Sequence, residues 1–412
     1  MDDIAIPSST PYLPDVGVLG LVPDAWEDVW MPRHQILSHL SRFYNVVWMN
    51  PAKEWRTIVA SRAESKPEKN DLTRLNGFLV YEPEKWLPLL YRPRFLANFF
   101  FRLRLKRAQN LLSHPGSRKI VLYLWRPEFE RALALSEYDL SVYHIDDEYS
   151  FSTVENSISE TEARILANVD QVFIHSPALF DKKGTINSNT DLVPNGVNYK
   201  SFSKPATEPH DMAPIPHPRI GYTGRLKNQL DWQLLSNLAL KHPEWSFVFI
   251  GPQAPHPEIT NFINELSCQP NVFFLGAKSV QDLALYPQHF DICIMPYRAN
   301  DYTKFIYPLK LHEYLASGRP VVGTYIRTLH DFADVVTLVR EPDDWSLAIK
   351  KALGPLNNTT ERRAARQEVA RQHDWQLLVI RVAKKIAQGL GQEYAGRLEK
   401  VLSKYVKSAD AG

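Results

Sequence analysis

The sequence predicts an α/β protein made of two doubly wound, Rossmann-like domains that face each other across a cleft. Three observations indicate this fold. At 412 residues the chain is too long for one compact core. Short, continuously apolar, β-rich runs alternate with helical stretches, which is typical of parallel sheets covered by helices on both faces. One proline-rich segment, residues 203–218, interrupts the alternation and predicts a stiff linker between the domains.

The first domain is expected to span residues 1–203 and to bind the acceptor of any reaction that takes place in the cleft. Its expected strands are Val16–Leu21, Val46–Met49, Phe78–Tyr81, Ile120–Trp125, Leu140–Ile145, Gln171–His175 and Leu192–Pro194. Helical periodicity separates most of these runs, so neighbouring strands should be parallel and joined by crossover helices.

The second domain is expected to span residues 204–385 and to repeat the same pattern. Its expected strands are Ile220–Thr223, Ser246–Ile250, Val272–Leu275, Ile292–Met295, Val321–Thr324 and Val335–Val339. In such sheets ligands bind where the carboxyl ends of the strands meet, so the loops that follow strands are the candidate sites.

Composition and charge exclude several classes of protein. Cys268 and Cys293 are the only cysteines, which excludes a disulfide scaffold and a cysteine-rich metal site. The net charge of +2 gives no global field for nucleic acid, so no nucleic-acid partner is expected. No apolar run approaches the roughly 20 residues of a membrane-spanning helix. Residues 1–14 lack the basic-then-apolar order of a secretory signal, so a cytoplasmic location is expected.

The helix expected after the strand that ends at residue 295 is the strongest candidate for a ligand site. It opens with Pro308 and Leu309, and its free N–H groups and positive dipole end favour an anion. Lys310 opposes that dipole, which an anion bound between them would explain. Glu313 lies on the same helix face, and a carboxylate can accept two hydrogen bonds from a ribose diol. The alternative is an ordinary surface Lys–Glu pair.

Two further loops after strands add cations and a glycine to the same edge of the sheet. The residues expected to contact a diphosphate there are Gly224, Arg225, Lys227, Arg298, Thr303 and Lys304. Glycine lets the backbone approach a ligand, and Arg225 with Lys227 can clamp a diphosphate. The dinucleotide fingerprint Gly-x-Gly-x-x-Gly is absent, which argues against a nicotinamide-dependent enzyme. The combination favours binding of a nucleotide diphosphate.

Three segments carry a family resemblance. They are Leu311-His-Glu-Tyr-Leu-Ala-Ser-Gly-Arg-Pro-Val-Val322, Gly221-Tyr-Thr-Gly-Arg225 and Val193-Pro-Asn-Gly-Val197. In this order they are similar to the glutamate helix, the first-strand glycine loop and the exit from the first domain in GT-B glycosyltransferases. The closest likeness is to the family 4 (group 1) enzymes that build bacterial polysaccharides, and it covers most of the chain.

The resemblance implies a transferase that uses a nucleotide-diphosphate sugar of UDP or GDP type, with no other cofactor and no essential metal. It implies that Glu313 holds the ribose, that Arg225 with Lys310 or Lys304 holds the diphosphate, and that anomeric configuration is retained. Arg225 and Lys310 are thereby also catalytic candidates. It further implies that residues 386–412 form a helix packing back on the first domain. One departure stands out, because Phe305 occupies the position of the family's glutamate that contacts the donor sugar.

Candidate acceptor contacts lie at the carboxyl ends of first-domain strands. They are Trp30, Arg33, His34, Arg126 and His144. Sugars bind to aromatic faces and planar polar groups, which suits this set. A packed tryptophan lid with a satisfied arginine is the alternative for the segment around Trp30.

Three carboxylates crowd together after the expected strand Leu140–Ile145. In Asp146-Asp147-Glu148 mutual repulsion should shift pKa values, and one carboxylate could orient or deprotonate an acceptor hydroxyl. In GT-B relatives this loop faces the donor sugar, so the resemblance makes Asp146 and Asp147 catalytic candidates. Helix capping by Asp147 and Glu148 is the alternative.

Residues 86–107 combine six cations with large aromatic side chains and contain no carboxylate. This pattern predicts an interfacial segment on an anionic membrane, peripheral association with its inner face, and a lipid-linked saccharide as acceptor. A core helix with snorkelling basic rims and an RNA-binding segment are the alternatives. Two other functions stay open for the whole chain, a nucleotide-sugar 2-epimerase and a non-catalytic GT-B subunit that scaffolds a partner transferase.

Overall fold

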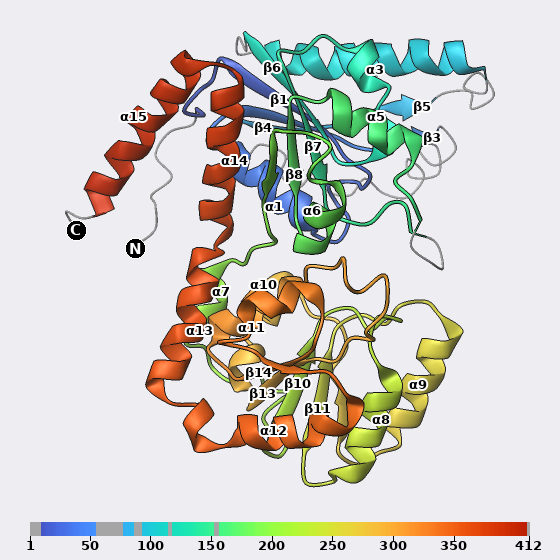
Figure 1. Ribbon diagram of the computed structural model, residues 1–412, viewed down its shortest axis with the longest axis vertical. Helices are drawn as coiled ribbons and strands as arrows, with labels where there is room; N and C mark the ends of the chain where they lie inside the picture. The colour runs from blue at the N-terminus through green and yellow to red at the C-terminus, as the bar shows by residue number, and fades with distance from the viewer. Residues whose placement is uncertain (1–9, 55–76, 86–92, 114–117, 152–155, 410–412) are drawn as a thin grey trace.

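The computed structural model describes residues 10–54, 77–85, 93–113, 118–151 and 156–409. Over these residues, two parallel sheets, each flanked by helices, form two domains stacked along the long axis of the molecule (Figure 1). The predicted α/β architecture with two doubly wound sheets is confirmed.

The N-terminal domain is built on a seven-stranded parallel sheet with the strand order β4-β2-β1-β6-β7-β8-β9. Its strands are β1 (Val16–Leu21), β2 (Asn45–Met49), β4 (Phe78–Tyr81), β6 (Lys119–Leu124), β7 (Leu140–Ile145), β8 (Gln171–Ile174) and β9 (Thr190–Leu192). Each expected strand is present close to its expected place. The short pair β3 (Lys53–Glu54) and β5 (Glu84–Lys85) was not predicted, because two-residue strands are too short to carry an apolar pattern.

Helices cover both faces of this sheet. They are α1 (Pro32–Leu40), α3 (Arg94–Ser113), α4 (Ala132–Leu135), α5 (Glu160–Asn168) and α6 (Pro177–Lys183). Side chains alternate along each strand. Val121 and Tyr123 of β6 therefore belong to the apolar cluster shared with α1, whereas Leu122 and Leu124 belong to the cluster shared with α3 and α5.

The C-terminal domain has a six-stranded parallel sheet in the order β12-β11-β10-β13-β14-β15. Its strands are β10 (Arg219–Thr223), β11 (Ser246–Ile250), β12 (Val272–Phe274), β13 (Ile292–Met295), β14 (Val321–Thr324) and β15 (Thr337–Val339). Its helices are α8 (Trp232–Lys241), α9 (Pro257–Ser267), α10 (Val280–Leu283), α11 (Leu309–Ser317) and α12 (Trp345–Leu353). Strand order reverses beside β1 in one sheet and beside β10 in the other. Ligands of such sheets bind at the carboxyl ends of the strands next to this reversal.

Two crossings connect the domains. The first runs through α7 (Tyr199–Ser203), and the second runs from α13 (Thr360–Gln372) into α14 (Trp375–Gly389) and α15 (Gln392–Ala409) (Figure 1). The crossings are hydrogen-bonded to each other, because the Val197 N–H donates to the His373 carbonyl at 3.0 Å and the Trp375 N–H donates to the Val197 carbonyl at 3.0 Å.

The chain returns to the N-terminal domain earlier than expected. The predicted boundary was 385/386, but α14 already packs on α1 and supplies buried residues from Trp375 to Ala387 to the N-terminal apolar cluster. The reason is that the apolar stripe of α14 faces the N-terminal sheet over nearly its whole length. The proline-rich segment 203–218 also differs from the stiff linker that was predicted. Its residues Met212 and Ile215 are buried in the C-terminal cluster, so the segment packs on that domain.

Candidate active site

The first turn of α11 lies on the side of the C-terminal domain that meets the N-terminal domain, named the C-terminal wall. Lys310 is half-buried there, with its Nζ 5.0 Å from the centre of the Tyr222 ring and 5.7 Å from that of Tyr297. Pro308 is the N-cap residue and Leu309 the first helical residue, as the sequence predicts for a helix that begins at the cleft. The side chain of Leu309 packs against the N-terminal cluster, so this helix start lies where the domains meet.

The glycine loop after β10 approaches Lys310 closely. Gly224 has φ +122°, a conformation that side chains rarely adopt. A Cβ atom at this position would lie 3.1 Å from the Lys310 Cε and 3.2 Å from its Nζ. Gly251 follows β11 with φ +148°, and a Cβ there would lie 2.1 Å from the Gly224 carbonyl oxygen. Because neither glycine has a side chain, the loop backbone can lie close to the side chain of Lys310.

Three cations gather at this edge without acidic partners. Among the residues that the structure describes, Arg225, Lys227 and Lys310 form no ion pair. Burial lowers the pKa of Lys227, and the nearby positive charges of Lys310 and Arg225 lower it further, against an opposing contribution from Asp147. Burial is the largest cause of this depression, and the smaller part due to Lys310 and Arg225 reflects repulsion that an anionic ligand between the cations would relieve.

Glu313 is half-buried one turn along α11 from Lys310. In the described part of the chain its carboxylate makes no hydrogen bond and no ion pair, so it is not paired with Lys310 as an ordinary surface glutamate would be. Burial raises the pKa of Glu313, and Lys310 opposes that rise. Its oxygens are therefore open to a donor from a ligand.

The loop between β13 and α11 holds three residues that were predicted to contact a diphosphate, and the structure places them in other surroundings. Thr303 is fully buried, and its hydroxyl donates to the Arg298 carbonyl at 2.5 Å, so it closes its own loop instead of facing a phosphate. The Arg298 side chain is exposed. Lys304 lies 3.7 Å from Asp301 and stacks over Phe305.

Arg33 is the centre of the opposite wall, on the N-terminal domain. It is buried and forms close ion pairs with both Asp24 and Asp146. Asp146 also accepts a hydrogen bond from the Tyr149 hydroxyl at 2.6 Å. The Asp146 carboxylate is thus committed to two protein donors, and Arg33 is satisfied, as the alternative interpretation expected.

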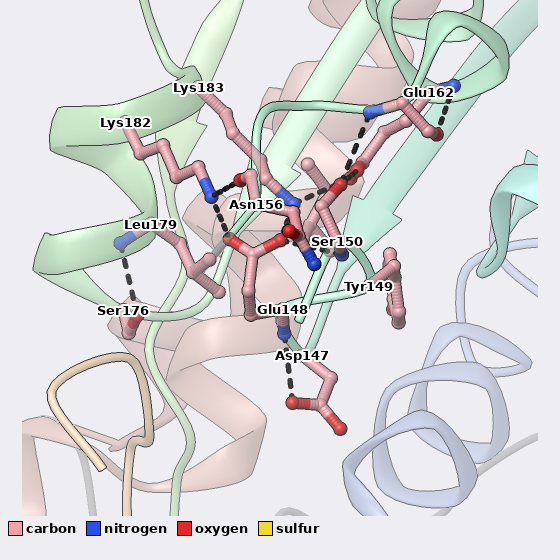
Figure 2. A network of polar contacts seen from close by, with 12 residues as sticks. Asp147, Glu148, Tyr149, Ser150, Asn156, Glu162, Ser176, Leu179, Lys182 and Lys183 are labelled. Carbon is pink, nitrogen blue, oxygen red and sulfur yellow. Dashed lines mark hydrogen bonds and ion pairs between the residues drawn. The ribbon is translucent and has the colours of Figure 1, made fainter. Parts of the chain in front are cut away.

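Asp147 has a different environment. Its carboxylate points away from the polar cluster formed by its neighbours (Figure 2) and accepts a hydrogen bond from the Glu148 N–H at 2.8 Å. Across the cleft the Tyr302 hydroxyl donates to the same oxygen at 3.3 Å. Helix capping does not explain Asp147, because α5 begins only at Glu160 and is capped by Ser159.

The aromatic acceptor candidates divide into buried and exposed ones. His144 is buried, stacks on Trp125 at 4.2 Å and contacts the Tyr123 hydroxyl through Nδ1 at 2.8 Å. Burial also holds the pKa of His144 well below its ordinary value. His34 is equally buried, whereas Trp30 stacks over His34 and is 41% exposed. The structure thus places both histidines in the core and leaves Trp30 at the surface.

Arg126 follows β6 and lies beside the two aspartates. Its guanidinium carbon is 4.6 Å from the centre of the Tyr149 ring. The Arg126 Nε is buried and has no hydrogen-bond partner among the described residues. An incompletely satisfied guanidinium next to Asp147 suits contact with a polar ligand.

A buried ion network supports this wall and was missed by sequence reasoning. Lys183 is fully buried and lies 3.1 Å from a Glu148 oxygen and 2.7 Å from a Glu162 oxygen, while Lys182 lies 3.1 Å from the other Glu148 oxygen (Figure 2). The charged residues come from three separate elements. The local sequence signal is limited to adjacent lysines in the last turn of α6, which ordinarily indicates a solvated helix end.

Helix α3 presents two faces. Phe101, Leu105, Ala108 and Leu112 are buried against the sheet. The outer face carries Phe95, which is 72% exposed, and Phe99, which is 55% exposed, beside the exposed cations Arg102, Lys106 and Arg107. Residues 86–92 of the predicted interfacial stretch lie outside the described residues.

No helix in the described ranges is long and apolar enough to cross a membrane. Over the same ranges no group of three or more His, Cys, Asp and Glu side chains is placed to hold a metal ion.

Comparisons with known proteins define the class. Residues 217–355, most of the C-terminal domain, match the family model described as Glycosyl transferases group 1. The fold is shared with Anabaena Alr3699/HepE in complex with UDP and glucose, at a TM-score of 0.64 and 15% identity over 90% of this chain and 99% of that one. It is also shared with a structure described as "Trehalose-6-phosphate from E. coli bound with UDP-2-fluoro glucose", at a TM-score of 0.65 and 13% identity over 91% and 98%. The chain therefore has the GT-B fold, and its C-terminal domain is similar to the glycosyl transferases of group 1, as the resemblance implied.

One relative matches this chain over most of its length. The chain is 28% identical over 381 residues to the Bacillus subtilis (strain 168) protein named "Putative teichuronic acid biosynthesis glycosyltransferase TuaH". The match covers 85% of this chain and 92% of the relative.

Proposed function

We propose that this protein transfers a sugar from a nucleotide-diphosphate sugar to a hydroxyl of a lipid-linked saccharide during cell-surface polysaccharide synthesis. The observation that carries the proposal is the group of unneutralised cations beside an unpartnered carboxylate on the C-terminal wall. Arg225, Lys227 and Lys310 have the charge that a diphosphate requires, and Glu313 has the acceptor oxygens for a ribose diol.

The proposed chemistry makes use of this arrangement. The acceptor oxygen attacks the anomeric carbon, the bond from that carbon to the diphosphate oxygen breaks, and the departing diphosphate takes the acceptor proton. Arg225 and Lys310 stabilise the charge that develops on the leaving group, in the role that a metal ion plays in other enzymes. The acceptor oxygen bonds to the anomeric carbon on the same face from which the diphosphate leaves, so the anomeric configuration is retained.

Asp147 is the catalytic carboxylate of this proposal, and it orients the acceptor hydroxyl whose proton the diphosphate takes. Asp146 is bonded to Arg33 and Tyr149, whereas Asp147 lies near Lys227 and Tyr302 of the opposite domain. An acceptor sugar would then contact Arg126 and the exposed ring of Trp30 at the same edge of the N-terminal sheet.

The relatives support a choice of donor and product. Two proteins of the same fold hold UDP or a UDP-sugar, which favours UDP over GDP as the nucleotide. The name of the Bacillus subtilis relative refers to teichuronic acid, which favours a cell-surface polysaccharide as the product.

The outer face of α3 supports peripheral attachment to the inner face of the membrane. Phe95, Phe99 and Leu103 are exposed at four-residue spacing, beside Arg102 and Lys106. A core helix would bury these aromatic rings, and exposed phenylalanines among cations match an anionic lipid surface. The helix lies on the side of the N-terminal domain away from the C-terminal domain, so docking would not cover the edge where the two domains meet (Figure 1).

A transfer assay separates the proposal from its rivals. The protein is incubated with UDP- and GDP-sugars and with detergent-solubilised lipid-linked saccharides, and release of nucleoside diphosphate is measured together with sugar in the lipid fraction. We expect acceptor-dependent release with one donor. Conversion of the sugar without release would indicate an epimerase, and nucleotide binding without any turnover would indicate a scaffold subunit.

Membrane docking is tested separately by sedimentation with phosphatidylglycerol vesicles. Each cation near an anionic surface contributes about 1 kcal/mol, so Arg102→Glu with Lys106→Glu should release the protein. Lys350→Glu with Lys351→Glu, an equal reversal on exposed residues of α12, is the control and should not. A wild-type protein that never sediments at low salt would refute the docking.

A further inference from the structure

The loop between β13 and α11 belongs to the C-terminal domain but is anchored in the N-terminal one. Phe305 is 3% exposed and lies in the apolar cluster beneath α3 and α5. Every other buried member of that cluster comes from residues 19–179. The ring therefore crosses the domain boundary and is covered by the opposite domain.

Phe305, which anchors the loop, contacts the buried ion network through Lys182. The Lys182 Nζ lies 5.3 Å from the centre of the Phe305 ring and 3.1 Å from a Glu148 oxygen, and it donates to the Asn156 carbonyl at 2.9 Å. Lys183 holds the second Glu148 oxygen and Glu162 (Figure 2). The lysine that contacts the anchor thus also fixes the residue that follows Asp147.

The same loop reaches Asp147 directly. Tyr302, three residues before Phe305, donates its hydroxyl to an Asp147 oxygen at 3.3 Å, and its ring lies 5.3 Å from that of Phe151. These contacts form a closed circuit of residues that runs from Phe305 through Lys182, Glu148 and Asp147 to Tyr302, which lies in the same loop as Phe305. As a result, residues of both domains restrain the carboxylate of Asp147.

We propose that Phe305 is a positioning residue that clamps the β13–α11 loop onto the N-terminal domain, so that the Tyr302 hydroxyl orients the Asp147 carboxylate. The inference rests on the proposed function, in which Asp147 faces the reacting sugar. Closing the domains and orienting the carboxylate then become one event. The nucleotide is held by residues of other elements, so the clamp controls turnover and leaves nucleotide affinity alone.

Position 305 therefore makes no contact with the donor in this chain. A phenylalanine clamp differs from a donor contact in a measurable way. Loss of a donor contact weakens donor binding, whereas loss of the clamp lowers kcat and lets the domains separate.

The variants for the test are Phe305→Ala, Phe305→Glu and Tyr302→Phe. Phe262→Ala is the matched control, because Phe262 packs on Trp232 within the C-terminal domain. Three quantities are measured: nucleoside diphosphate affinity by calorimetry, kcat and KM for the donor, and the radius of gyration of the nucleotide-free protein by small-angle X-ray scattering. Phe305→Leu replaces the other variants if they fail to fold.

We expect the Phe305 variants to keep nucleotide affinity, to lose kcat on the order of 10²-fold, and to show a larger radius of gyration. Tyr302→Phe should lower kcat and leave the radius of gyration unchanged. Phe262→Ala should lower only the melting temperature.

Wild-type kcat and radius of gyration in the Phe305 variants would overturn the inference, as would a loss of nucleotide affinity that matches the loss of kcat. If the wild type showed no turnover at all, the proposed function would fail. The radius of gyration would still decide whether Phe305 clamps the domains.

Discussion

The two walls that face each other where the domains meet use their charged side chains in opposite ways. On the N-terminal wall, Arg33 is paired with Asp24 and Asp146, and Lys183 with Glu148 and Glu162. On the C-terminal wall, the cations around Lys310 and the carboxylate of Glu313 find no ion-pair partner among the described residues.

The difference between paired and unpaired charges suggests a structural role for the first set and a ligand-binding role for the second. Paired and buried charges hold a wall in one shape, since breaking such a pair leaves an uncompensated charge in the interior. Unpaired cations that repel one another are unfavourable for the free protein. Their presence at a helix start where the domains meet supports the proposal that a ligand neutralises them. Substitutions on the two walls should accordingly change different quantities.

The largest expected effect is on stability and belongs to the N-terminal wall. Lys183→Met removes the cation between Glu148 and Glu162, which should lower the free energy of unfolding by roughly 3–5 kcal/mol. Urea denaturation measures this loss. Lys384→Ala is the control, because its pair with Glu399 is exposed and should contribute at most about 1 kcal/mol. Equal losses in the two variants would remove the distinction between the walls.

Removing cations from the C-terminal wall should affect turnover and not stability. Arg225→Ala and Lys310→Met are each expected to lower kcat by roughly 10²–10³, because each removes a charge that faces the leaving diphosphate. The free energy of unfolding should change much less than in Lys183→Met, because neither side chain has an ion-pair partner among the described residues. Activity should also survive a chelator. Wild-type rates in both variants would place the diphosphate elsewhere.

A smaller effect is expected on the carboxylate of the same wall. Glu313→Gln keeps the shape of the side chain and loses a charge-assisted hydrogen bond, which should weaken nucleotide binding by about 1.5–3 kcal/mol in calorimetry. Glu258→Gln, in the exposed first turn of α9, is the matched control. Undiminished affinity in the Glu313 variant would exclude this residue from the ribose site.

The smallest effect concerns pH. Burial and neighbouring cations lower the pKa of Lys227, so in the free protein it begins to lose its proton below the usual pH range for lysine. A bound diphosphate favours the protonated form and raises that pKa. Nucleotide affinity should therefore fall as the pH rises through the pKa of the free protein, by at most about tenfold per pH unit. Lys227→Arg should flatten this dependence, and an identical pH profile in that variant would exclude Lys227 as its source.

The walls also differ in how far their residues could be predicted from the sequence. The strands and the C-terminal wall could be predicted from local patterns, because Gly224 directly follows β10, and Lys310 and Glu313 lie in α11, the helix that comes after β13. The N-terminal network did not, because Glu162 and Lys183 lie 21 positions apart and meet only in the folded domain.

His144 and Phe305 show the same limit in different ways. His144 lies between Tyr143 and Ile145 in a strand that is buried on both faces, so alternation could not tell which way its side chain points. Phe305 lies in a loop whose covering residues belong to the other domain. A contact of that kind leaves no periodic signal in the chain.

We propose that the unpaired charges of the C-terminal wall hold a nucleotide diphosphate. The decisive experiment is calorimetric titration of the wild-type protein with UDP and GDP, each compared with its nucleoside. One diphosphate should bind, and its nucleoside should bind on the order of 10²-fold more weakly, because the nucleoside lacks the charge that the cations neutralise. Equal affinity for a nucleoside and its diphosphate, or no binding of either nucleotide, would contradict it.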